Sequence, residues 1–204
     1  MLEQLIPFLT ASMALTIFPG PDIIYVMVQG MANGKKAGIV TALGLATGTI
    51  IHTSLVAFGV SAIIRNSVTL LLIIELFGAA YLLYLAWQVY RSEAEIAYSA
   101  KGIKHRTYFS LYKKGFIMNV LNPKVTIFFL AFFPGFLWSE EMSTVIQFYI
   151  LGAAFLLQTV LIFGTVALMA GKISTYLKRH KHSAVVLKWL QIVVFIGIAV
   201  LILL

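Results

Sequence analysis

Two charged residues that directly follow prolines are the first candidates for a functional site. Asp22 is the sole aspartate of the chain, and Lys124 is the one Lys or Arg that falls well inside an apolar stretch. Asp22 follows Pro21, Lys124 follows Pro123, and the two charges are 102 residues apart in a chain of 204. A charge at the centre of a bilayer costs at least about 2.5–3.5 kcal/mol, so both should face a protein interior. They are expected either to bind a ligand together or to form a structural ion pair.

Prolines next to these charges predict where the helices are interrupted. A proline removes a helical N–H donor and clashes with the preceding turn, so Phe18–Asp22 should interrupt the first helix and Asn122–Lys124 should kink or break the fourth. Backbone groups freed at the breaks are then available to a ligand. All five prolines lie in the first apolar stretch of one half of the chain or the other: Pro7, Pro19, Pro21, Pro123 and Pro134. The predicted substrate site consists of Gly20, Pro21, Asp22, Asn122, Pro123 and Lys124.

Two more ionisable residues, His52 and Glu75, are predicted near the middle of their apolar stretches. Histidine changes charge near neutral pH, and burial shifts the proton affinity of a carboxylate, so both are candidates for carrying a proton. The alternative for His52 is a neutral ring bonded to a neighbouring helix. Gln158 is expected to form a bond between helices, with substrate contact as its alternative.

Membrane helices are the elements that must position these residues. The chain is 61% hydrophobic and 11% charged, against roughly 45–50% and 25% in soluble domains. Lipid offers no partners for free backbone groups, so the predicted fold class is an all-α integral membrane protein. Six stretches are long enough to cross a hydrocarbon layer of about 30 Å: residues 5–30, 38–64, 68–90, 115–137, 144–170 and 184–204.

The basic residues predict the orientation of these helices. Lys and Arg concentrate in the loops after the first, third and fifth stretches, whereas the opposite loops hold only Arg65. Positive residues stay cytoplasmic, so both termini should be periplasmic or extracellular. His180 and His182 lie in the last basic loop and are expected to face solvent and lipid headgroups.

The longest polar segment divides the chain into two sets of three predicted helices. Residues 1–204 form one transmembrane domain, with a first three-helix repeat at 1–90, a cytoplasmic loop at 91–114 and a second repeat at 115–204. Three helices are an odd number, so the repeats should have opposite orientations, a plan typical of secondary transporters. Gly44 and Gly48 are expected to allow close packing of helices.

The ordered motifs resemble those of the LysE/RhtB amino-acid exporters of bacterial inner membranes. They are Pro19-Gly20-Pro21-Asp22, Gly44-Leu45-Ala46-Thr47-Gly48 followed by His52, Gly78-Ala79-Ala80-Tyr81-Leu82, Asn122-Pro123-Lys124, and Phe133-Pro134-Gly135-Phe136. The resemblance covers essentially the whole chain. It implies export of amino acids or close derivatives by proton exchange, without a bound cofactor. It looks closer to the homoserine, threonine and neutral amino-acid branch than to the lysine and arginine branch.

The composition and motifs also bear on several other functions. An exporter of another small solute or of a metal cation is the main alternative, although a site without thiolates suits a soft metal poorly. The absence of cysteine excludes a thiol-disulfide redox protein. No catalytic motif or aspartate pair indicates an enzyme, and the scattered basic clusters do not indicate nucleic-acid binding. The expected partners are a small-molecule substrate and the lipid bilayer, with a second copy of the chain as a candidate.

Overall fold

The computed structural model describes residues 2–18, 20–93, 107–180 and 182–203, which form helices and short connections without any strand. This confirms the all-α prediction. Within these residues, four helices are long and apolar enough to cross a membrane, and the number rises to six if each of two bent helix pairs is one span. Pro19 and the basic residues Lys101, Lys104 and Arg106 lie outside the described residues.

The first half begins with a bent pair, α1 and α2, whose axes meet at 59°. Pro21 opens α2 at a position where its missing N–H donor is not needed. Gly34 makes the turn into α3 with a φ of 85°, a conformation that favours glycine. The helices of this half are α1 (Leu2–Ile17), α2 (Pro21–Ala32), α3 (Lys35–Leu55), the π-helical turn η1 (Val56–Val60), α4 (Ser61–Asn66) and α5 (Val68–Arg91).

The second half begins with another bent pair, in which the helix starting at Tyr108 meets the helix starting at Pro123 at 51°. The first of these begins before the expected residue 115, because the Thr107 hydroxyl accepts a hydrogen bond from Ser110 N and caps it. The elements are α6 (Tyr108–Val120), α7 (Pro123–Phe132), the 3-10 turn η2 (Phe133–Phe136), α8 (Thr144–Arg179) and α9 (His182–Leu203).

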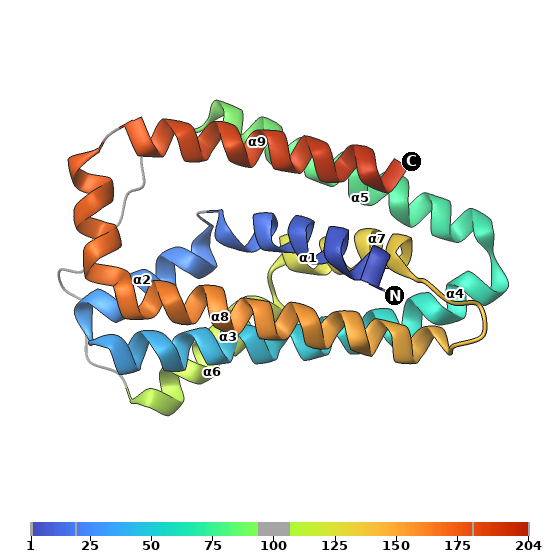
Figure 1. The fold of residues 1–204 in the computed structure, drawn as a ribbon, viewed down its shortest axis with the longest axis horizontal. Coiled ribbons are helices and arrows are strands. Elements are labelled where there is room, and N and C mark those ends of the chain that lie inside the picture. Colours follow the sequence, from blue (N-terminus) through green and yellow to red (C-terminus); the bar gives the residue numbers. More distant parts are fainter. Residues whose placement is uncertain (1, 19, 94–106, 181, 204) are drawn as a thin grey trace.

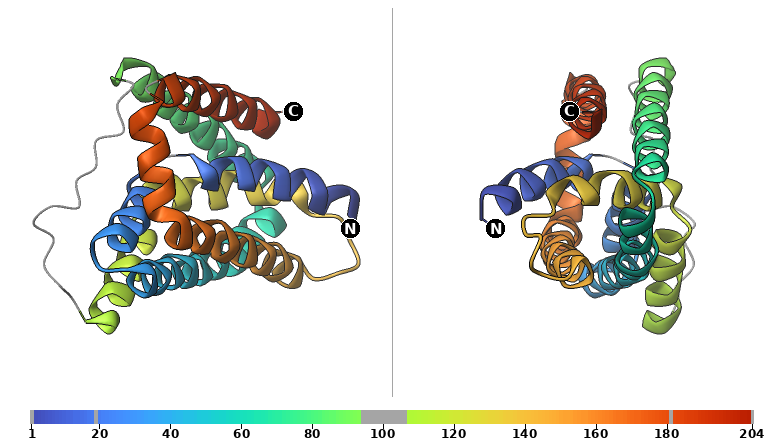
Figure 2. Two further views of the ribbon diagram at one scale, coloured as in Figure 1. Left: turned by 60° about the vertical axis from the view of Figure 1, so that its left-hand side comes forward. Right: turned by 90° about the vertical axis from the view of Figure 1, so that its right-hand side faces the viewer.

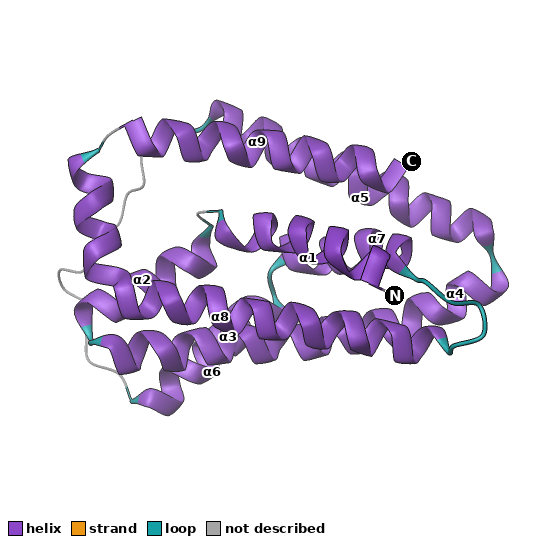
Figure 3. Ribbon diagram, in the orientation of Figure 1, coloured by secondary structure: helices purple, strands orange, loops and turns teal. Residues whose placement is uncertain are grey.

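The helices form three layers, with α1 and α7 in the middle (Figures 1 and 2). The α5–α9 pair lies on one side of them, and α3, α6 and α8 lie on the other. Figure 3 shows that the described loops join the ends of these helices, with an extended one before α8. The core is aromatic where α7 crosses it: Phe128, Phe129, Phe132 and Phe133 are at most 2% exposed. This packing holds α7, and therefore Lys124 in its first turn, at the centre of the molecule.

Both chain termini lie at the same end of the molecule (Figure 1). The α2–α3 connection, the end of α8 and the start of α9 lie at the opposite end. Lys35 and Lys36 follow that connection, and Arg179 ends α8. The basic residues of these two connections therefore gather at the end away from the termini.

Candidate functional site

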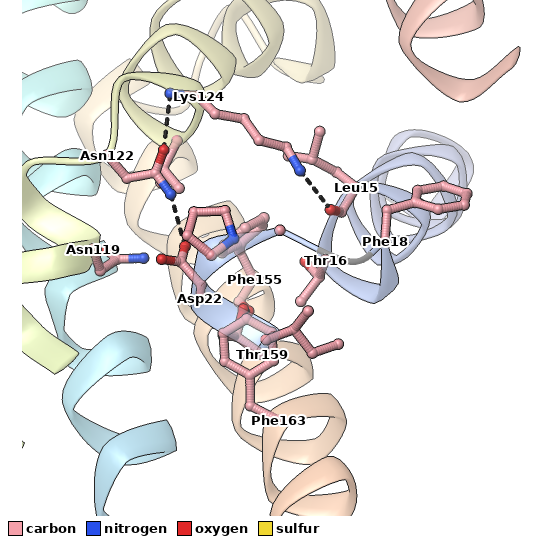
Figure 4. Close-up of a pocket in the computed structure, with 14 residues that line it drawn as sticks. Leu15, Thr16, Phe18, Asp22, Asn119, Asn122, Lys124, Phe155, Thr159 and Phe163 are labelled. Atoms are coloured by element: carbon pink, nitrogen blue, oxygen red, sulfur yellow. Dashed lines mark hydrogen bonds between the residues drawn. The ribbon is translucent and has the colours of Figure 1, made fainter. Parts of the chain in front are cut away.

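The two helix breaks meet at one cavity of about 50 Å³. A cavity needs at least about 10–15 Å³ to hold a water molecule, so this one is large enough to be hydrated. Residues of α1, α2, α6, α7 and α8 surround it, with contributions from the breaks themselves (Figure 4). The predicted site residues that line it are Gly20, Pro21, Asp22, Asn122 and Lys124. Pro123 opens α7 next to the cavity without lining it.

Asp22 reaches the cavity from the first turn of α2. Its carboxylate stands at the positive end of the helix dipole, which favours negative charge. The Asn122 side chain donates a hydrogen bond from Nδ2 to Asp22 Oδ2 over 2.7 Å (Figure 4). The break in the first half is thereby bonded to the break in the second half.

Lys124 lies in the first turn of α7 and points toward α1. Its Nζ donates to the carbonyl oxygen of Leu15 at 3.2 Å. This carbonyl belongs to the last turn of α1, where the helix break leaves carbonyl groups without helical partners. The same Nζ lies 5.1 Å from the ring centroid of Phe195 on α9. A backbone group freed by the first break thus holds the ammonium group supplied by the second.

Asn122 stands between the two charges. While Nδ2 bonds Asp22, Oδ1 accepts from the backbone N of Lys124 at 3.0 Å and caps α7. No salt bridge joins Asp22 to Lys124 among the described residues, so the ion pair considered from the sequence is not formed in this conformation. Each charge has a neutral partner instead, which leaves its charge available to a charged ligand.

Asn119 is a lining residue that the motifs did not single out. It is 3% exposed, and Figure 4 shows its amide nitrogen turned toward the Asp22 carboxylate. Its Oδ1 has no hydrogen-bond partner. A Cβ at Gly48 of α3 would lie 2.7 Å from this oxygen, so glycine leaves the space that Asn119 occupies. The sequence contained one sign of this role: Asn119 is a second asparagine in the same apolar stretch, three residues before Asn122.

The opposite wall of the cavity comes from one face of α8. Phe155, Thr159 and Phe163 are four residues apart and all line it. Gln158 instead faces α1, where its Oε1 accepts from Ser12 Oγ at 3.2 Å. The expectation that Gln158 bonds two helices therefore agrees with its position.

His52 contacts the site indirectly. It is 1% exposed, and Nε2 donates to the carbonyl oxygen of Asn119 at 3.0 Å, since a carbonyl can only accept. Its Nδ1 has no hydrogen-bond partner, and its ring packs on Phe129. Glu75 is half-buried on α5 and does not line the cavity, and no hydrogen bond or ion pair reaches it from the described residues. The structure thus brings His52 to the edge of the site but not Glu75.

Close contact between α3 and α6 supports the break in the second half. A Cβ at Gly44 would collide with the backbone of Tyr112, and one at Gly115 would lie 2.6 Å from the carbonyl oxygen of Thr41. The backbones therefore approach too closely for a larger residue at these glycines. No group of three His, Cys, Asp or Glu side chains within the described ranges could hold a metal ion.

Comparisons with known proteins identify a family and relatives that the sequence resembles. The family described as LysE type translocator matches residues 13–204. The chain is 27% identical over 175 residues to the homoserine/homoserine lactone efflux protein of Salmonella typhimurium, an alignment that covers 86% of this chain and 84% of that protein. It is 31% identical over 144 residues to the uncharacterized membrane protein YrhP of Bacillus subtilis, covering 67% and 69%. No solved structure matches the chain. The resemblance seen in the motifs is confirmed, and the chain belongs to the LysE type translocator family.

Proposed function

We propose that the chain exports neutral amino acids or close derivatives across the bacterial inner membrane in exchange for protons. One observation carries the proposal: Asp22 and Lys124 line a single cavity, and each is held by a neutral group. An amino acid is a zwitterion, so its ammonium group pairs with Asp22 and its carboxylate with Lys124. The printed name of the Salmonella relative, which concerns homoserine and its lactone, supports the same class of substrate.

The lining of the cavity favours a substrate with an uncharged side chain. Among the described lining residues, Asp22 is the sole acid and Lys124 the sole base. The main-chain groups of an amino acid use both charges, and none remains for a charged side chain. The α8 wall offers a hydroxyl at Thr159 between two aromatic rings, which suits a small side chain that is apolar or carries a hydroxyl.

The two halves are proposed to work as inverted repeats, residues 1–90 and 115–204, joined by a cytoplasmic loop at 91–114. Asp22 and Lys124 occupy corresponding places, each following the proline that opens the second helix of a broken pair. Rocking of one repeat against the other would expose the cavity to either side of the membrane in turn. Both termini are then periplasmic.

Proton exchange follows from competition for one carboxylate. A proton and the ammonium group of a substrate both bind Asp22, and each excludes the other, so release of substrate outside is linked to uptake of a proton. His52 is proposed to assist because it holds the backbone of Asn119, a lining residue. Glu75 is the second candidate as a half-buried carboxylate in a membrane helix.

An export assay with two charge-neutralising variants tests the proposal. Asp22→Asn and Lys124→Met should each abolish resistance of cells to toxic concentrations of homoserine or threonine, because each removes the partner of one substrate charge. Immunoblots of membrane fractions should show normal abundance. The matched controls are Glu141→Gln and Lys172→Met, exposed residues outside the cavity that should leave resistance unchanged. Full resistance in both test variants would refute the proposal.

A further inference from the structure

A second hollow lies beside the helix break of the first half, and its surface is apolar. It has a volume of about 460 Å³ between the α1–α2 pair, α8 and the first turns of α9. We name it the acyl groove. Thr165 is its sole polar lining residue among the described ones, and Ile17, Ile23 and Leu161 are typical of the rest. A zwitterionic amino acid would lose its hydration there without gaining partners, so the groove does not suit the transported substrate.

A third hollow, of about 710 Å³, adjoins the acyl groove where α8 ends and α9 begins. We name it the headgroup hollow. Arg179, His182 and Ser183 line it, and none of its described lining residues is acidic. His180 also lines it, but its ring stacks on Tyr176 and its Nδ1 contacts the carbonyl oxygen of Tyr176. Among the described lining residues, Arg179 is therefore the cationic group still open to a ligand, and the His182 ring lies beside it.

The two hollows adjoin each other and share two lining residues. Leu177 of α8 and Leu187 of α9 line both. The site is thus apolar at one end and basic at the other, and its basic end lies at the end of the molecule away from the termini. These two ends complement an anionic phospholipid: the basic end matches its phosphate, and the apolar end matches its acyl chains.

We propose that the acyl groove and the headgroup hollow together bind one anionic phospholipid of the cytoplasmic leaflet. The lipid phosphate lies at Arg179, whose guanidinium can donate two parallel hydrogen bonds, with the Ser183 hydroxyl and His182 beside it. One acyl chain fills the groove. Ile23 lines both the acyl groove and the substrate cavity, so the lipid acyl chain packs against the helix that carries Asp22. The site does not depend on what the protein transports.

Lipid binding by the purified full-length chain tests the site. Native mass spectrometry in a neutral detergent measures the affinity for dipalmitoyl phosphatidylglycerol, dihexanoyl phosphatidylglycerol and dipalmitoyl phosphatidylcholine. The first should bind most tightly, because it alone supplies both the anionic headgroup and long chains. Arg179→Gln should weaken its binding about fivefold, the effect expected for one basic residue. Lys36→Gln is the matched control, an exposed cation at the same end but outside both hollows.

A groove variant tests the acyl half of the site independently. Thr165→Trp fills the acyl groove. It should weaken the binding of dipalmitoyl phosphatidylglycerol and leave the affinity for the dihexanoyl lipid unchanged. Near-native melting temperatures identify the variants that have folded, and either variant alone is sufficient for the comparison. Equal affinity for phosphatidylglycerol and phosphatidylcholine would overturn the proposal. So would an equal effect of Lys36→Gln and Arg179→Gln, or displacement of the lipid by millimolar inorganic phosphate, which would indicate a site for a free anion.

Discussion

Asn122 has two separate tasks at the site. Its Oδ1 caps α7 at the backbone N of Lys124, and its Nδ2 donates to Asp22. A serine at residue 122 would keep the cap but is too short to reach Asp22, whereas an alanine would lose both bonds. The two tasks can therefore be separated by comparing two substitutions.

We expect Asn122→Ala to lower the free energy of unfolding by about 1 kcal/mol more than Asn122→Ser, because a lost helix cap costs about that much. Both variants should impair export, since both leave Asp22 without its amide donor. Thermal unfolding of the purified protein and an export assay measure the two effects. Wild-type export by Asn122→Ser would show that the bond to Asp22 has no part in function.

The sequence was sufficient to identify the charged pair but not its partners. Asp22 and Lys124 stood out because charges are costly in apolar stretches. Asn119 had no such mark, because an uncharged amide in a membrane helix is common and its role depends on which way it faces. That direction is determined by the packing of α6 on α3, where Gly48 leaves space for the side chain.

At the scale of elements, the prolines predicted where two helices change direction. α2 and α7 both open with a proline, and the helix pairs bend by 59° and 51° at these places. The bends matter because they end α1 within reach of Lys124. In a continuous helix the carbonyl of Leu15 would accept a backbone hydrogen bond, whereas the break leaves it to accept from the ammonium group.

The contact between α3 and α6 gives a prediction for a glycine. Gly44→Ala should lower the free energy of unfolding by about 1–3 kcal/mol, because the added methyl group would collide with the backbone of Tyr112, which cannot rotate away. The measurement is thermal unfolding of the purified protein in detergent.

Gly197 provides the matched control for this substitution. It lies in α9 with no atom within 4 Å of an added Cβ. Gly197→Ala should therefore leave stability unchanged or raise it by up to about 1 kcal/mol, since alanine loses less conformational freedom in a helix. Equal melting temperatures for the two variants would contradict the close approach of α3 and α6.

At the scale of the whole molecule, the layered arrangement places both termini at the end away from the basic connections (Figure 1). Positive residues remain on the cytoplasmic side, so both termini should be periplasmic. Alkaline phosphatase fused after Leu204 should be active, and green fluorescent protein at the same place should be dark. A fusion after Lys36 should show the reverse pattern. Bright fluorescence of the fusion at Leu204 would show that the predicted orientation is wrong and that this terminus is cytoplasmic.

The sequence by itself determined the class of the protein, because its local signals are energetically strong. Long apolar stretches require helices in lipid, and the prolines at residues 21 and 123 mark the two helix breaks, whereas Pro7 lies inside α1. Only the tertiary structure decided which groups meet. It joined Asn122 to Asp22, gave Lys124 the carbonyl of Leu15 and left Glu75 outside the cavity. These pairings depend on the rotation of each helix about its axis, which is determined by close packing between segments far apart in the chain.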